Sequence, residues 1–128
     1  MPQFYYDHDH LYSPDPQKTV EWYMRVFGAK KTGETKTPRM NLIHMDINGA
    51  HLIVAGPFQG EFARAKQTEQ YVGLDHFGFK TENLEEAIKD LKAKGVKFLQ
   101  DLTVTPSGGK IAFLEAPDNV RIELTERP

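Results

Sequence analysis

The sequence predicts an α+β fold of two tandem βαβββ modules, which form a curved mixed sheet with helices on its outer face. One observation is a repeat with a spacing of 68 positions, which lays Asp7–His8 on Asp75–His76. Each copy has a strand-like start, a helix opener, an apolar stripe at helical spacing and a glycine stop, and three strand-like segments follow. Each copy also supplies one imidazole, and paired imidazoles are common metal ligands. The concave face is therefore predicted to be a metal-binding groove.

Length and composition indicate one ordinary globular domain spanning 1–128. The chain is 39% hydrophobic and 27% charged, and its net charge of −2 predicts no nucleic-acid or membrane partner. It has no cysteine, which excludes disulfides, zinc–thiolate sites and thiol nucleophiles. The start, MPQFYYDHDH, lacks the basic and apolar regions of a signal peptide, so a cytoplasmic protein is expected.

The first module is expected at about 4–56. Phe4–Ser13 is rich in aromatic residues and reads as a strand. Asp15 and Pro16 have the types preferred at a helix N-cap and first helical position, and Gly28 is placed to end the helix. Three strands are predicted after it, and Asn48-Gly49 between the last two suits a type I′ turn. Their ranges are Lys30–Thr35, Met40–Ile47 and Ala50–Ala55.

A connecting segment at 57–72 lacks a clean strand period and is expected to form a helical turn or a mobile flap. The second module follows at about 73–126, beginning with a strand over Gly73–Lys80. Asn83 and Glu86 have the spacing of a capping box, and Gly95 marks the helix end. The strands predicted after this helix are Val96–Thr105, Lys110–Glu115 and Arg121–Thr125.

Side-chain alternation predicts which residues enter the groove. In the last strand, Ile122 and Leu124 should face the helix, which leaves Glu123 on the groove side. The same reasoning puts His76 in the groove. The first strand is less regular, because the face opposite His8 carries Asp7 and Asp9, which are unusual residues for a core.

The chain resembles the vicinal oxygen chelate superfamily, which includes glyoxalase I, methylmalonyl-CoA epimerase, extradiol dioxygenases, fosfomycin-resistance transferases and bleomycin-resistance proteins. The resemblance covers essentially the whole chain. The segments that carry it are DHDHLYSPDPQKTVEWYMRVFGAK, GLDHFGFKTENLEEAIKDLKAKGVKF and GGKIAFLEAPDNVRIEL.

The resemblance implies metal ligands at four symmetry-related strand positions. His8, His76 and Glu123 match the first, third and fourth. The second falls on Ala55 by strict repeat arithmetic or on Ile53 by aligning IEL with LIV, and neither can bind metal. Two histidines and one carboxylate suit Fe, Mn, Ni, Co or Zn as divalent ions, and leave open positions for a substrate.

Other histidines are given subsidiary roles. His10 is expected to face the substrate or support a ligand. His51 is expected to lie on the surface or contact substrate, with a displaced fourth ligand as the alternative. His44 is expected on the strand surface. Glu123, His10 and His51 are the candidates for acid–base catalysis.

Three functions remain open at this point. The first is a metal-dependent lyase or isomerase of the glyoxalase or epimerase kind, which chelates a small substrate through adjacent oxygens. The second is an Fe(II) extradiol-type dioxygenase, which the vacant fourth position favours. The third is a non-enzymatic binding or resistance protein that uses the groove for a small molecule. The resemblance implies a homodimer.

Overall fold

The computed structural model describes residues 3, 5–57 and 73–128 of the chain. The chain divides into two compact units, Met1–Phe62 and Ala63–Pro128. Each unit has the element order βαβββ that the repeat predicts, and each forms its own four-stranded mixed sheet. The predicted α+β fold with two tandem modules is therefore confirmed. Most of the predicted connecting segment, 58–72, lies outside the described residues.

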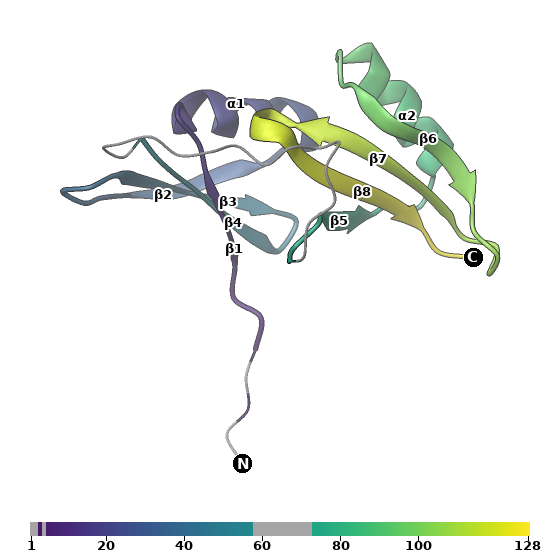
Figure 1. Ribbon diagram of the computed structural model, residues 1–128, viewed down its shortest axis with the longest axis horizontal. Coiled ribbons are helices and arrows are strands. Elements are labelled where there is room, and N and C mark those ends of the chain that lie inside the picture. Colours follow the sequence, from purple (N-terminus) through teal and green to yellow (C-terminus); the bar gives the residue numbers. More distant parts are fainter. Residues whose placement is uncertain (1–2, 4, 58–72) are drawn as a thin grey trace. The chain divides into compact units, whose positions relative to one another are not determined.

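The sheet of the first unit has the strand order β1-β4-β3-β2. Strand β1 runs parallel to β4, and the other neighbours are antiparallel. Helix α1 packs on one face of this sheet, against β2, β3 and β4 (Figure 1). The elements are β1 (Asp9–Tyr12), α1 (Pro16–Phe27), β2 (Lys30–Lys36), β3 (Asn41–Ile47) and β4 (Ala50–Gly56).

Helix α1 begins and ends at the residues expected from the sequence. The Lys18 backbone N–H donates to the Asp15 carboxylate, 3.2 Å away, and Pro16 occupies the first turn, where its missing N–H costs nothing. Gly28 ends the helix in the left-handed conformation, with φ of 69°. Val20 and Tyr23 on the apolar side of the helix are fully buried against the sheet.

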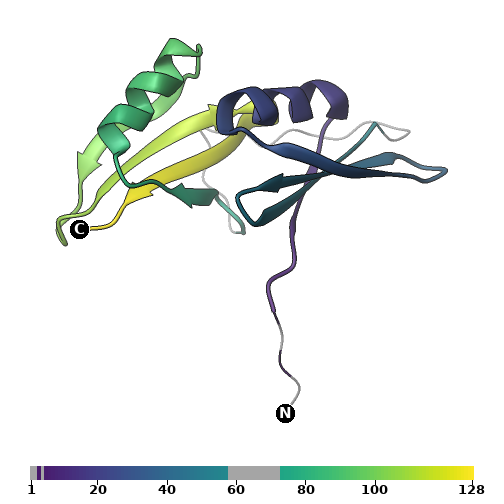
Figure 2. The same cartoon turned by 180° about the vertical axis from the view of Figure 1, so that it is seen from behind.

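The second unit repeats this arrangement with the order β5-β8-β7-β6, and β5 is parallel to β8. Helix α2 packs on β6 and β8 (Figure 2). The elements are β5 (Phe77–Lys80), α2 (Leu84–Ala93), β6 (Phe98–Val104), β7 (Lys110–Ala116), a 3-10 turn (Pro117–Asn119) and β8 (Val120–Glu126).

Helix α2 has two caps from different parts of the chain. The Asn83 side chain accepts from the Glu86 backbone N–H at 3.1 Å, which confirms the first half of the predicted capping box. In place of the reciprocal bond, the Asn83 amide donates to the Glu86 carboxylate. Glu126, at the end of β8, accepts from the Leu84 backbone N–H at 2.7 Å. A second orphan amide of the first turn is thus satisfied from the sheet.

Both parallel strands are shorter than the sequence suggests. Ladder pairing of β1 with β4 begins only at Asp9, and that of β5 with β8 only at Phe77. The sequence pattern of residues 5–8 and 73–76 favours extended backbone, but these residues pair with no strand among the described parts of the chain. An apolar or aromatic run favours extended backbone, whereas a strand also needs a partner within hydrogen-bonding reach.

Alternation along the strands agrees with the predicted faces. Ile122 and Leu124 of β8 are buried, whereas Glu123 between them is half-buried on the opposite face. Ile43 and Met45 of β3 are buried in the same way under α1. Each sheet therefore has one face covered by its helix and an opposite face, here called the open face, that no helix of the described residues covers. The histidines lie on the open faces. Within the described residues, no helix is long and apolar enough to cross a membrane.

Candidate metal and substrate site

The second unit brings His76 and Glu123 together. His76 directly precedes β5, Glu123 lies on β8, and the His76 Nε2 atom is 3.3 Å from Glu123 Oε2. Both side chains are about one-quarter to one-third exposed, at 32% and 26%. They are therefore reachable by an ion or small molecule while partly shielded from water.

The other ring nitrogen of His76 faces a second carboxylate. Asp75 Oδ2 lies 2.7 Å from His76 Nδ1. This hydrogen bond from His76, followed by the charge of Arg121, lowers the pKa of Asp75 below its usual value. A carboxylate that accepts from Nδ1–H selects the tautomer in which Nε2 carries a lone pair, which is the state in which a histidine binds metal.

The geometry of this pair fits a divalent cation. Two ligands about 2.1 Å from one ion, at cis or tetrahedral angles, are separated by about 3.0–3.4 Å, and the observed separation of Nε2 and Oε2 is 3.3 Å. With Asp75 holding the proton on Nδ1, Nε2 and the Glu123 carboxylate are two acceptors that face one another. A cation between them would satisfy both acceptors.

Two further residues hold His76 in place. The Phe113 ring packs edge-on against the imidazole, with centroids 4.9 Å apart and an interplanar angle of 90°. The Arg121 guanidinium lies 5.0 Å from the centroid of the same Phe113 ring, and its Nη1 atom is 3.3 Å from Asp75 Oδ1. His76 is thus flanked by an aromatic ring and two carboxylates, and Arg121 contacts the ring and one of the carboxylates.

The first unit repeats the aspartate–histidine pair. Asp7 Oδ2 lies 2.6 Å from His8 Nδ1, and this hydrogen bond lowers the pKa of Asp7. The sequence signal for both orienting carboxylates is the Asp-His dipeptide that each copy of the repeat contains. Asp7 does not enter the core, because it precedes β1 and its side chain is exposed.

Asp9 has a different partner. The hydroxyl of Tyr6 donates to its carboxylate, and this hydrogen bond raises the pKa of Tyr6 to about 12. Both aspartates that alternation could not explain therefore have local polar partners on the surface.

All four histidines of the first unit gather on its open face. The His51 ring lies 5.7 Å from that of His8, which in turn lies 6.2 Å from that of His10. His51 also stacks on His44, with centroids 5.3 Å apart, and His44 Nδ1 is 3.1 Å from His51 Nε2. One ring therefore donates to the other, and His44 has a role beyond that of a strand-surface residue.

The pKa of His10 lies below the usual value for histidine. Although much of the side chain is exposed, partial loss of hydration lowers its pKa, and the nearby charges of His8 and His44 lower it further. His10 therefore favours the neutral form, in which one ring nitrogen can accept a proton.

The strand registers identify the first-unit counterpart of Glu123. His10 pairs with Ile53 in the parallel ladder of the first unit, and Gly78 pairs with Glu123 in that of the second. His10 follows His8 by two residues, and Gly78 follows His76 by two residues, so His10 and Gly78 correspond. Their ladder partners therefore correspond as well, and the counterpart of Glu123 is Ile53 and not Ala55. Ile53 is 6% exposed and has no donor atom.

The predicted site residues thus form two groups. His8, His10 and His51 lie together in the first unit, and His76 lies with Glu123 in the second. Over residues 3, 5–57 and 73–128, no three histidine or carboxylate side chains form a group that could hold one ion. The three-ligand set His8, His76 and Glu123 therefore stays a prediction.

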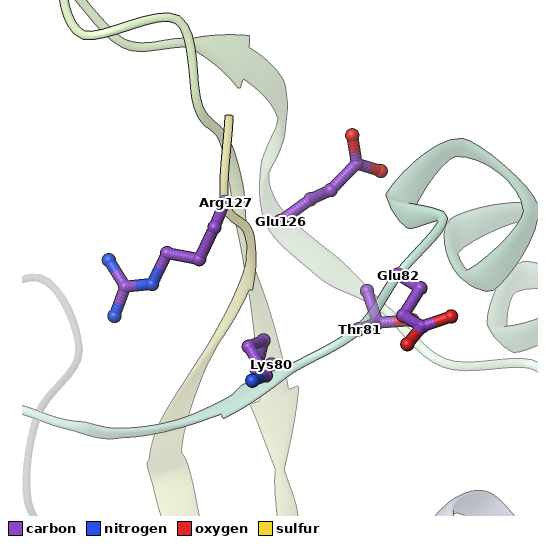
Figure 3. A pocket seen from close by; sticks show the side chains of 5 residues that line it. All are labelled: Lys80, Thr81, Glu82, Glu126 and Arg127. Atoms are coloured by element: carbon purple, nitrogen blue, oxygen red, sulfur yellow. The ribbon is translucent and has the colours of Figure 1, made fainter.

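A separate depression in the second unit does not have the features of this site. It has a volume of about 290 Å³ and is lined by Lys80, Thr81, Glu82, Glu126 and Arg127. Figure 3 shows that the charged ends of Arg127 and Glu126 point away from one another. Since Glu126 is already engaged with the start of α2, the depression offers no converging set of free polar groups.

Comparison with known proteins identifies the family. The model of the Glyoxalase/Bleomycin resistance protein/Dioxygenase superfamily matches residues 5–124. The uncharacterized protein YwkD of Bacillus subtilis is 26% identical over 115 residues, which cover 88% of this chain and 89% of YwkD. The lactoylglutathione lyase GLX1 of Arabidopsis thaliana is 25% identical over 122 residues. This match covers 88% of the chain but 41% of the plant enzyme.

Solved structures show the same fold. A glyoxalase family protein from Enterococcus faecalis superposes with a TM-score of 0.81 and 25% identity, covering 93% of this chain and 94% of that one. The fosfomycin resistance protein FosX from Listeria monocytogenes superposes with a TM-score of 0.73 and 18% identity, covering 99% and 96%.

Proposed function

Because the chain belongs to the Glyoxalase/Bleomycin resistance protein/Dioxygenase superfamily, we propose that it is a divalent-metal-dependent enzyme that chelates a small substrate through adjacent oxygens. The proposed chemistry is that of a glyoxalase- or epimerase-like lyase or isomerase. The similarity to a lactoylglutathione lyase supports this choice.

The observation that carries the proposal is the His76–Glu123 pair. Nε2 and Oε2 lie 3.3 Å apart, and Asp75 occupies the other ring nitrogen. An imidazole between two carboxylates is a suitable ligand for a divalent cation, because the cation supplies the positive charge that both carboxylates require.

In this proposal His8 is the third ligand, and Asp7 orients it as Asp75 orients His76. A bound divalent ion would polarise the substrate oxygens and stabilise negative charge on them. Glu123 would help to hold the ion and would take the proton from the carbon next to a carbonyl. His10, whose pKa is lowered, and His51 would exchange protons with the substrate.

Fe(II) extradiol-type dioxygenation is the second candidate, and a specific observation favours it. The counterpart of Glu123 is the apolar Ile53, so the proposed set has three ligands where a four-ligand site would have one more. Two histidines and one carboxylate leave open positions on iron for a catechol and oxygen.

A non-enzymatic binder of a small molecule is the third candidate, and it would use the same open faces without turnover. For all three candidates we propose a cytoplasmic homodimer. Light scattering coupled to size-exclusion chromatography tests the dimer, which should have twice the 14.6 kDa mass of the chain.

Metal content tests the proposal first. Protein purified without a histidine tag is expected to contain, or to take up, one divalent ion per chain. His76→Ala and Glu123→Ala should lose that ion, while His44→Ala, which removes an imidazole from the other unit, should retain it. Equal metal content in all four proteins would overturn the proposed site.

Turnover then separates the candidate reactions. Conversion of a hemithioacetal, or exchange of a proton next to a carbonyl, without oxygen uptake would support the lyase or isomerase. Catechol-dependent oxygen uptake by the iron-loaded protein would select the dioxygenase. Stoichiometric ligand binding with neither activity would select the binder.

A further inference from the structure

Arg121 stands apart from the other groups on the open face of the second sheet. It lies on β8, two residues before Glu123, so both side chains project from the same side of the strand. The proposed function assigns it no part. Nevertheless, it is the residue that connects Phe113 with Asp75.

The contacts of Arg121 restrict its guanidinium to one orientation. The guanidinium carbon lies 5.0 Å from the centroid of the Phe113 ring. Phe113 itself is buried, with 8% of its surface exposed. Arginine stacks well on an aromatic face because its planar cation meets the negative π surface. Within the described residues, the buried Nε atom has no hydrogen-bond partner, so the polar contact of the group is directed through Nη1 to Asp75.

The two oxygens of Asp75 are divided between two partners. Oδ1 faces Arg121 Nη1 at 3.3 Å, and Oδ2 faces His76 Nδ1 at 2.7 Å. Asp75 is half-exposed, with 55% of its side chain accessible, and a carboxylate so exposed would otherwise change rotamer freely. Arg121 therefore reduces the freedom of the carboxylate that orients the imidazole.

Orientation matters here because His76 has a carboxylate at each ring nitrogen. Asp75 stabilises the tautomer protonated on Nδ1, and Glu123 at 3.3 Å stabilises the tautomer protonated on Nε2. The shorter contact favours Nδ1–H, but only while Asp75 stays in place. The first unit differs at this point, because His51 occupies the register position that corresponds to Arg121.

We propose that Arg121 is a positioning residue, which holds Asp75 so that the His76 ring keeps its proton on Nδ1 and presents the Nε2 lone pair beside Glu123. The consequence for metal rests on the proposed function, whereas the consequence for the ring proton does not. Arg121 acts only through Asp75 and Phe113.

The direct test is the tautomer of His76 in metal-free protein, read from ¹⁵N spectra of the histidine side chains at alkaline pH, where the ring is neutral. The wild type is expected to carry the proton on Nδ1. Arg121→Met should shift the population toward Nε2–H, and Asp75→Asn should do so further, since an amide can also donate to Nδ1. Arg127→Met removes the same charge from the same unit and should leave the wild-type spectrum.

Metal affinity provides the second readout. Loss of an outer-shell partner weakens metal binding by about 10- to 100-fold. Asp75→Asn should lie within this range for Zn²⁺, Arg121→Met near its lower end, and Arg127→Met at the wild-type value. Arg121→Lys keeps the charge but loses the planar stack on Phe113, so it should give an intermediate tautomer population and affinity.

The outcomes separate the two proposals. If Arg121→Met matches Arg127→Met in tautomer and affinity, the positioning role is wrong. If the wild type binds no metal but Arg121→Met shifts the tautomer, the positioning role holds and the proposed function fails. Should Arg121→Met lack the folded circular dichroism spectrum, Arg121→Lys decides, and a wild-type tautomer in that folded variant would overturn the role.

Discussion

The open faces of the two sheets have matching strand registers but different chemistry. In the second unit, the positions around His76 hold a glycine, an aromatic ring and an arginine, with Glu123 among them. In the first unit, the positions around His8 hold three more imidazoles, with an isoleucine in place of the glutamate. The corresponding pairs are His10 and Gly78, His44 and Phe113, His51 and Arg121, and Ile53 and Glu123.

This difference shows how one repeated backbone can supply two kinds of surface. Gly78 is the clearest case, because a Cβ atom there would lie 3.1 Å from the Glu123 backbone oxygen and 3.4 Å from its Cβ. A side chain at Gly78 would therefore crowd Glu123, whereas the first unit has His10 beside Ile53 at the corresponding position. The second face thus places a carboxylate next to its imidazole, and the first face gathers imidazoles alone.

The largest effect is expected when Glu123 of the second face is replaced by isoleucine, the residue at the corresponding position of the first face. Glu123→Ile should lower Zn²⁺ affinity by more than the roughly 100-fold that outer-shell changes reach, because the variant lacks a ligand of the proposed site. Isothermal titration measures this directly. Glu115→Ile removes a carboxylate from the neighbouring strand β7 and should bind Zn²⁺ as the wild type does; equal losses in both variants would contradict the special role of Glu123.

The ends of the two inner strands also correspond, since Gly56 of β4 and Glu126 of β8 share a register position. Gly56 has φ of 145°, and a Cβ atom there would lie 2.0 Å from the Ser13 carbonyl oxygen. Gly56→Ala should therefore lower the free energy of unfolding by about 3 kcal/mol or more, measured by urea denaturation.

Gly33→Ala is the matched control for this change. Gly33 has ordinary φ and open space around its Cα atom, so the variant should stay within about 0.5 kcal/mol of the wild type. Similar losses in the two variants would show that the close approach of Ser13 does not determine the requirement for glycine at the end of β4.

A smaller effect is expected when His44 is replaced by phenylalanine, because its counterpart in the second unit is Phe113. His44→Phe removes the hydrogen bond to His51 and the like charge that lowers the pKa of His10. The pKa of His10 should rise toward its usual value but remain below it, because loss of hydration is the larger cause. Proton NMR titration of His10 tests this, and an unchanged pKa would exclude an influence of His44. Stability should change by no more than about 1 kcal/mol.

The smallest effect concerns the ion pair between Glu85 of α2 and Lys110 of β7. Hydrogen bonding to Glu85, aided by the charge of Glu126, raises the pKa of Lys110. A raised lysine pKa means that its stabilising interaction is complete at neutral pH and is lost as the pH rises through the raised value. Glu85→Gln should lower the pKa of Lys110 toward its usual value, as followed by NMR of the lysine side chain.

Asn41, the register counterpart of Lys110 in the first unit, has no charge. The alkaline loss in the second unit therefore has no equivalent at that position of the first. A pKa of Lys110 that is unchanged in Glu85→Gln would assign the shift to Glu126 alone.

Several parts of this architecture could be predicted because they depend on neighbours in the chain. Asp15, Asn83 and Gly28 act on backbone groups within a few residues, and Asn48-Gly49 forms its turn locally. The side on which Glu123 projects follows from alternation within one strand. The position of Ile53 could not be derived with the same certainty, because the offset between the copies grows from 68 at His8 to 70 at Ile53.

The sequence by itself determined the two βαβββ modules, the ends of both helices and the face on which Glu123 lies, since these follow from local backbone preferences and from the period of the strands. Only the tertiary structure decided where β1 and β5 begin, that His44 stacks on His51, and that Asp75 contacts both His76 and Arg121. Arg121 and Asp75 are 46 positions apart in the chain, and the contact of His44 with His51 depends on the register between β3 and β4. Register is determined by packing across a whole sheet, so no short stretch of sequence contains it.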